Sequence, residues 1–340
     1  MKADEVNRET RTKRPAVASA GGRLINSQRW KGTARQRVAD YGIVVLFVAL
    51  IIVGGIVYNE FFSGGNLRSI LSESAPLGVV AIGETFVIIG AGFDLSVGST
   101  YAIGATVFAL VGNAHSWLLA GFLAVLLGLA LGAINGVVVT QLKVNPFIAT
   151  FGTGSIYSGG VLLLTNNTAY PLDRYSELGA GDIGGIPVSA IVLAVLLVVG
   201  GVVLHRSVYG RKVYAVGGND EASHLAGLRV GLIRGGTYVM SGGMAAFAGV
   251  MEASLLGSGQ GNIGTNTALD SIAIVVIGGT ALLGGEGAMW RTAVGLLIIG
   301  ILDNIFFGLA LNANWQTVVT GAILIAAVAF DMLVRRGSQT

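Results

Sequence analysis

The stretch "WLLAGFLAVLLGLALGAINGVVVT", residues 117–140, decides the class of fold. It runs for 24 residues without a single Asp, Glu, Lys or Arg. A helix needs about 20 apolar residues to cross roughly 30 Å of hydrocarbon, so this stretch is predicted to span a membrane. Within it Gly128, Gly132 and Gly136 recur every four residues, which predicts a face for close packing against another helix.

Similar apolar runs fill most of the chain. Its 340 residues are 53% hydrophobic and only 11% charged, whereas a soluble domain carries about 25% charged residues. We therefore predict an all-α polytopic membrane protein with about ten transmembrane helices (a range of about eight to ten), some of them broken or re-entrant. The candidate spans are residues 41–58, 69–90, 95–112, 117–140, 147–165, 188–205, 232–256, 269–283, 292–311 and 316–333.

Two of these candidates are irregular. Span 95–112 follows its predecessor almost without a gap, and span 269–283 is short and ends in "GGTALLGGEG". Irregular backbone at membrane depth is tolerated only where protein or a watery cavity covers it. We therefore expect both places to line the interior of the protein.

The placement of basic residues predicts the orientation. With the N-terminus inside, nineteen of the 21 Lys and Arg residues fall in inside segments, and only Arg68 and Arg174 fall outside. Because cytoplasmic loops carry the excess of Lys and Arg, both termini are predicted to be cytoplasmic. The predicted parts are a basic disordered tail (1–38), a transmembrane domain (39–336) with an inner loop at 206–231 and an outer loop at 166–187, and a short cytoplasmic tail (337–340).

The motif "AGFDLSVGS", residues 91–99, joins two spans. Gly92 and Gly98 permit sharp bends of the backbone, and Asp94 can cap a helix that starts at Leu95 or Ser96. Two interpretations remain open at this point. The motif is either a helix break at membrane depth or a tight inner turn between two spans.

A second motif, "KVNPFIATFGTGS" at residues 143–155, places Asn145 before Pro146, where proline suits the first position of a helix. For this motif a structural role is favoured over a functional one. The full set of residues predicted to lie along a translocation path or at helix breaks is Asp94, Ser96, Gly98, Asn145, Phe147, Asp270, Gly278 and Gly279.

Several chemistries are missing from the sequence. No Lys follows a Gly, so the chain has no Gly-x-x-x-x-Gly-Lys-[Ser/Thr] phosphate loop. It has no cysteine and only three widely separated histidines, so we expect no metal site and no cofactor. The intramembrane acids Glu84, Asp94, Asp270 and Asp303 are scattered over separate spans with no basic partner. This scatter disfavours an ion-coupled secondary carrier for a small polar solute, which stays the alternative function.

The polar stretch "GRKVYAVGGNDEASHLAG", residues 210–227, predicts a short capped helix in the inner loop. Asn219 suits the N-cap, Asp220 and Glu221 suit the first turn, and Gly227 suits the position after the C-cap. The helix has about seven residues, and its apolar face is formed by Ala222, Leu225 and Ala226. Reversing the chain needs only a few residues, but this loop has 26. Docking to another protein is therefore favoured over a plain chain reversal.

The stretch from Gly210 to Arg234 resembles the cytoplasmic coupling loop of permease subunits in bacterial ABC importers of the ribose, xylose, arabinose and galactose branch. The matching positions are Gly210, Arg211, Ala215, Gly217, Gly218, Asn219, Ala222, Ala226 and Gly227. Collinear matches occur at "GFDLSVGS", "KVNPFIATFGT", "ALDSIAIVVIGGTALLGGEG" and "AVAFDMLVRR". Together they cover roughly residues 40–336.

This resemblance implies a transport subunit in the bacterial inner membrane, not an enzyme. It implies that two copies of the chain form the path for a monosaccharide or related polyol, that separate ATPase subunits dock from the cytoplasm, and that an extracytoplasmic protein delivers the sugar. No nucleic-acid partner is expected. The residues implied to couple to the ATPase are Gly210, Arg211, Gly217, Asn219, Asp220, Glu221, Ala222, Leu225 and Gly227.

Overall fold

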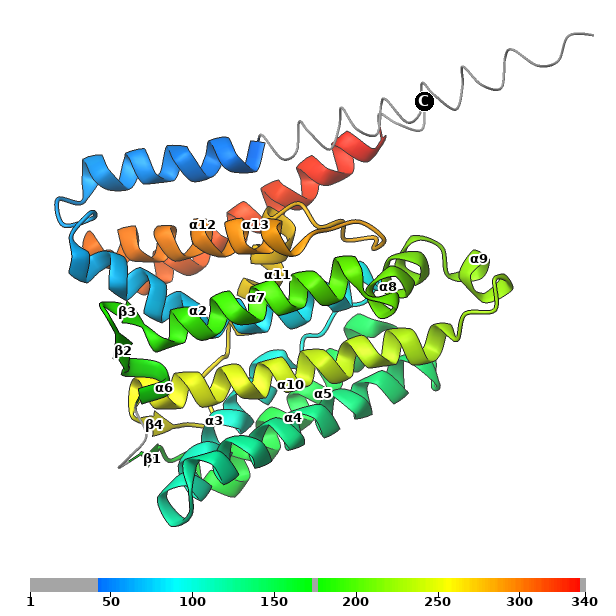
Figure 1. The fold of residues 1–340 in the computed structure, drawn as a ribbon, viewed down its shortest axis with the longest axis horizontal. Coiled ribbons are helices and arrows are strands. Elements are labelled where there is room, and N and C mark those ends of the chain that lie inside the picture. The colour runs from blue at the N-terminus through cyan, green and yellow to red at the C-terminus, as the bar shows by residue number, and fades with distance from the viewer. Residues whose placement is uncertain (1–41, 173–176, 337–340) are drawn as a thin grey trace, which may run out of the picture. The chain divides into compact units, whose positions relative to one another are not determined.

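The computed structural model describes residues 42–172 and 177–336, and the predicted tails 1–38 and 337–340 lie outside this part. The described chain is almost entirely helical (Figure 1). It begins with helix Gly42–Val57. The helices that follow are α2 (Gly64–Ile89), α3 (Val97–Ala114), α4 (Trp117–Thr140), α5 (Pro146–Thr165), α6 (Glu177–Ala180), α7 (Val188–Arg206), α8 (Val208–Gly218), α9 (Asp220–Leu225), α10 (Val230–Leu256), α11 (Thr267–Ile277), α12 (Met289–Gly308) and α13 (Ala313–Arg336).

Four two-residue strands form two short antiparallel pairs. Strand β1 (Tyr170–Pro171) pairs with β4 (Ser258–Gly259), and β2 (Asp182–Ile183) pairs with β3 (Ile186–Pro187). Arg68 at the start of α2 forms an ion pair with Asp182 in β2. These contacts order part of the predicted outer loop 166–187, which the sequence analysis left without secondary structure.

Helix α2 is the centre of the core. Its residues from Ala75 to Ile89 are buried almost throughout, and it packs against α7, α10, α11 and α12. A helix that is apolar on every side is stable only when other apolar groups surround it. The neighbouring helices provide these apolar groups, so the C-terminal half of α2 is packed inside the bundle.

The predicted glycine face of α4 packs against α10, and the two helices run along one another in Figure 1. A Cβ atom added to Gly136 would lie 2.9 Å from the Gly235 carbonyl oxygen, and one added to Gly242 would lie 2.9 Å from the Gly132 Cα. The backbones are therefore in direct contact, as the four-residue spacing predicted.

Other faces of the bundle expose large apolar side chains. Examples are Phe122 and Leu126 on α4, Phe151 and Leu163 on α5, and Val198 on α7. Lipid can cover such faces, whereas water cannot do so favourably. Seven described helices (α2, α3, α4, α5, α7, α10 and α12) are long and apolar enough to cross a membrane. The all-α polytopic class is thus confirmed. Each predicted span contains a helix, while ten crossings and the orientation of the termini stay predictions.

The predicted span 269–283 is interrupted, as its sequence indicated. Helix α11 has only 11 residues, about 16 Å at 1.5 Å per residue, and it ends at Ile277. Gly279 then takes a positive φ of 80°, a conformation that glycine adopts without strain. Residues 278–288 continue without a helix or strand until α12 begins.

Candidate functional site: the α8–α9 segment and the α2–α3 break

Helix α8 was not predicted from the sequence. The Ser207 hydroxyl caps it by accepting a hydrogen bond from the Gly210 N–H at 2.9 Å, and its apolar residues Val213 and Val216 are buried. The helix predicted for this loop from the sequence begins only after Asn219. Together α8 and α9 form the α8–α9 segment, residues 208–227.

Helix α9 matches the predicted capped helix. The Asn219 Oδ1 atom accepts a hydrogen bond from the Ala222 N–H at 2.8 Å. The helix has six residues, ends at Leu225, and is followed by Gly227 with a φ of 80°. Leu225 is 81% exposed. Its side chain therefore offers an apolar surface that the described residues leave largely uncovered.

Gly217 brings α8 into backbone contact with the end of α2. A Cβ atom at this position would overlap the Ile89 carbonyl oxygen, and the same carbonyl accepts a hydrogen bond from the Gly285 N–H at 2.9 Å. Three distant parts of the sequence thus meet at Ile89. The glycine is required because any side chain would separate them.

The predicted coupling residues differ in burial. Gly210 and Gly217 are both buried, and a Cβ atom on Gly210 would overlap the Leu204 carbonyl oxygen. Both glycines therefore serve contacts inside the chain. The residues of the set that are exposed and free to meet a partner are Arg211, Asn219, Asp220, Glu221, Ala222, Leu225 and Gly227.

Arg234, at the start of α10, links α9 to the end of α2. Its Nε atom donates a hydrogen bond to the Gly90 carbonyl oxygen at 3.0 Å, and its NH1 atom lies 3.4 Å from the Asp220 Oδ2 atom. The sequence analysis counted Arg234 only as an inner basic residue. Its 144-residue separation from Gly90 left no local pattern that could have revealed the contact.

Two tyrosines of α8 add further ties. The Tyr214 hydroxyl donates to the Gly287 carbonyl oxygen at 2.7 Å, and the Tyr209 hydroxyl donates to the Ile233 carbonyl oxygen at 3.1 Å. Burial raises the pKa of each tyrosine to about 12. Both hydroxyls therefore remain neutral donors at physiological pH, and α8 is tied to α10 and to the 278–288 segment.

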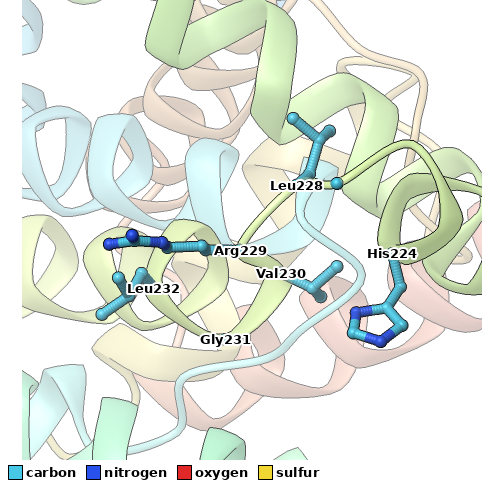
Figure 2. A pocket seen from close by; sticks show the side chains of 7 residues that line it. His224, Leu228, Arg229, Val230, Gly231 and Leu232 are labelled. Carbon is cyan, nitrogen blue, oxygen red and sulfur yellow. The ribbon is translucent and has the colours of Figure 1, made fainter.

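A hollow lies where α9 passes into α10 (Figure 2). It has a volume of about 490 Å³. Figure 2 shows His224 at one edge and Arg229 with Leu232 at the other. The lining residues are His224, Gly227, Leu228, Arg229, Val230, Gly231 and Leu232. The mixture of charged and apolar side chains beside an exposed helix is suited to receiving side chains of another protein.

The α2–α3 break differs in detail from the prediction. The left-handed residue is Ala91, with a φ of 58°. Neither Gly92 nor Gly98 has a positive φ. Both glycines instead allow close packing, because added Cβ atoms would meet the Tyr238 hydroxyl and the Gly264 carbonyl oxygen, respectively. Helix α3 begins at Val97, later than predicted, and Ser96 is its N-cap.

The break lies inside the bundle. Asp94 is fully buried, and its N–H donates to the Glu84 Oε1 atom at 3.2 Å. The chain therefore turns back along α2, which favours the interpretation as a break over that of a turn at the inner surface. It also corrects the expectation of scattered acids, because Glu84 and Asp94 lie side by side.

The other predicted path residues do not gather at one place. Asn145 caps α5, its Oδ1 atom accepting from the Phe147 N–H at 3.0 Å, and Phe147 is 56% exposed. Asp270 is half-buried in the first turn of α11, and Gly278 is buried against the Arg291 carbonyl group. Asp94 and Ser96 are buried too deeply to line an open path in this conformation.

Comparison with known proteins identifies the family. The model of the family described as "branched-chain amino acid transport system / permease component" matches residues 66–328. This chain belongs to that permease family. The permease is 36% identical to the ribose import permease of Haemophilus influenzae over 295 residues, covering 84% of this chain and 91% of the relative.

Two further relatives agree with this assignment. The ribose import permease of Bacillus subtilis is 37% identical to the permease over 294 residues, covering 84% of this chain and 90% of the relative. The D-allose transport system permease of Escherichia coli is 33% identical over 301 residues, covering 87% and 92%. No solved structure matches the permease. The resemblance found in the sequence is therefore confirmed at the level of the family, which includes permeases of monosaccharide ABC importers.

Proposed function

We propose that the permease is the membrane-spanning subunit of an ABC importer for a monosaccharide or related polyol. Two copies of the chain would form the path in the bacterial inner membrane, with both termini in the cytoplasm. Separate cytoplasmic ATPase subunits would supply the energy, and an extracytoplasmic binding protein would deliver the sugar. The ribose and allose permeases that cover most of this chain support this proposal.

The observation that carries the coupling role is the link from α9 to α2. Helix α9 is exposed and capped, and the described residues leave most of Leu225 uncovered. Helix α9 is tied to the buried end of α2 through Arg234 and Gly90, while α8 meets Ile89 through Gly217. A push on α9 would therefore reach α2 and the adjacent break through short, direct contacts.

The test is reconstitution of the full chain in proteoliposomes, with and without its ATPase and binding protein. We expect uptake of labelled ribose or allose only when both partners are present and ATP is supplied on the side of the membrane where the ATPase is bound. Sugar uptake by the permease alone, driven by a Na⁺ or proton gradient, would contradict the proposal and support the ion-coupled carrier. Competition by unlabelled sugars and polyols on the binding protein would then define the substrate.

A further inference from the structure

Glu84 of α2 and Asp94 of the α2–α3 break form a pair of fully buried carboxyl groups. Each residue is 0% exposed, and the Asp94 N–H lies 3.2 Å from the Glu84 Oε1 atom. Neither group takes part in the coupling contacts described above. Their neighbourhood therefore calls for a separate explanation.

Hydrogen bonds satisfy only one oxygen of each carboxyl group. Asp94 Oδ1 accepts from the Ser96 N–H at 3.1 Å and from the Ser96 hydroxyl at 2.6 Å, and the Asn135 Nδ2 atom lies 3.4 Å away. Glu84 Oε1 accepts from the Asp94 backbone. Within the described part of the chain, the second oxygens, Glu84 Oε2 and Asp94 Oδ2, are buried and meet no hydrogen-bond partner.

Two buried hydroxyl groups of α10 lie near the two acids. Tyr238 is 0% exposed and Ser241 is 1% exposed, and among the described residues neither hydroxyl makes a hydrogen bond. The Tyr238 hydroxyl faces Gly92 of the break and feels the charge of both acids. The Ser241 side chain approaches the Asp94 carboxyl group. Four buried oxygen atoms that lack a hydrogen-bond partner among the described residues thus belong to neighbouring side chains.

The described residues provide no positive charge that pairs with these two acids. No described Lys, Arg or His forms an ion pair with Glu84 or Asp94. The other titratable groups facing the pair are Tyr157 of α5, Tyr238, and Arg234, whose guanidinium is already engaged by Gly90 and Asp220. Burying an ionised carboxylate costs several kcal/mol unless a positive charge accompanies it.

We propose that Glu84, Asp94, Tyr238 and Ser241 form a binding site for one small monovalent cation, either a proton or Na⁺. A proton would need only the two free carboxyl oxygens and would leave the pair with a single negative charge. Na⁺ is a hard cation, and hard cations prefer the all-oxygen set that these four side chains provide. The site stabilises the α2–α3 break next to Gly90, and it does so independently of any ATPase partner.

The experiment uses the full chain in lipid nanodiscs. Thermal unfolding is measured from acidic to alkaline pH with Na⁺ or with choline as the only monovalent cation, and infrared spectra record the carbonyl band of protonated carboxyl groups. Glu84→Gln preserves shape and mimics a protonated acid, so it should fold. Glu73→Gln, at an exposed acid on the same helix, is the control.

A Na⁺ site predicts that Na⁺ raises the melting temperature of the wild type and of Glu73→Gln but not of Glu84→Gln. A proton site predicts that Na⁺ has no effect on the melting temperature. The melting temperature should instead fall as the pH rises, because deprotonation creates two facing negative charges. The infrared spectrum should show a protonated-carboxyl band that Glu84→Gln removes. The proposal is overturned if Glu84→Gln responds to Na⁺ and pH as the wild type does and leaves the infrared band unchanged.

Discussion

Arg234 donates a hydrogen bond through Nε to the carbonyl oxygen of Gly90 at 3.0 Å. Gly90 is the C-cap of α2, and the C-terminal carbonyl groups of a helix carry partial negative charge. The guanidinium therefore stabilises the end of α2, while its NH1 atom faces Asp220 on α9. One side chain thus joins the proposed docking helix to the buried end of α2.

Replacing Arg234 by Ala should separate ATP hydrolysis from transport. A hydrogen bond from a charged group contributes about 1.5–3 kcal/mol, so we expect sugar uptake by the reconstituted importer to fall about tenfold or more while ATPase activity persists. Lys212→Ala is the control, because Lys212 is an exposed basic residue of α8 that lies outside the proposed coupling set. Normal uptake by the Arg234→Ala importer would refute the role given to this residue.

Gly217 and Gly218 provide a matched pair of substitutions. A Cβ atom on Gly217 would overlap the Ile89 carbonyl group, whereas one on Gly218 would meet nothing closer than the Gly285 Cα at 3.9 Å. We expect Gly217→Ala to lower the melting temperature and to impair uptake, and Gly218→Ala to resemble the wild type. Equal behaviour of the two variants would show that α8 and α2 are not in tight contact.

The cap of α9 can be tested by hydrogen–deuterium exchange. A six-residue helix is marginal alone, and loss of an N-cap side chain costs about 1 kcal/mol. Asn219→Ala should therefore speed amide exchange in residues 222–226 about fivefold, while Asn219→Ser should largely retain protection. Unchanged exchange in the Ala variant would mean that tertiary contacts, rather than the cap, hold α9.

The fold class and most helix positions could be predicted because they depend on local composition. Apolar runs of sufficient length, glycine spacing in α4 and the caps of α9 are all properties of neighbouring residues. The ends were less certain: α3 begins at Val97 rather than at Leu95 or Ser96, because Asp94 turns toward Ser96 and Glu84 instead of capping the helix directly.

The contacts that connect α8, α9 and the α2–α3 break could not be predicted from local sequence. Arg234 and Gly90 are far apart in sequence, and so are Gly217 and Ile89. The pairing of Glu84 with Asp94 required the chain to fold back along α2, which no helical periodicity records. Sequence reasoning also assigned Gly210 and Gly217 to a docking surface, because a glycine needed for internal backbone contact looks the same as one needed for a partner.

The α4–α10 contact gives a stability prediction. Leu at Gly132 would force apart two backbones that now touch, whereas Leu at Gly121, on the same helix, would enter open space with nothing within 4 Å. We expect Gly132→Leu to reduce the yield of folded protein and to lower its melting temperature, and Gly121→Leu to be neutral. Size-exclusion profiles and thermal unfolding in detergent would compare them; a neutral Gly132→Leu would contradict the packing.

Alkaline titration should reveal the two tyrosines of α8. Their pKa values of about 12 lie above the ordinary value of 10.0, so folding favours their neutral forms. The stabilisation from this preference is fully present below pH 10 and is lost as the pH rises toward 12. Ultraviolet absorbance should show that Tyr209→Phe and Tyr214→Phe each remove one late-titrating phenolate. Titration of both near pH 10 in the folded protein would contradict their burial.

The shortness of α11 has a consequence for how a path could open. Unwinding a continuous transmembrane helix would expose its backbone N–H and C=O groups to hydrocarbon. Each hydrogen bond lost in this way costs several kcal/mol. After α11 the chain continues instead as the irregular segment 278–288, which touches α8 at Gly285 and Gly287. Such a segment changes shape by rotating a few dihedral angles. Under the proposed function, ATP hydrolysis by the partner would then act on segment 278–288 through α8, without unwinding a transmembrane helix.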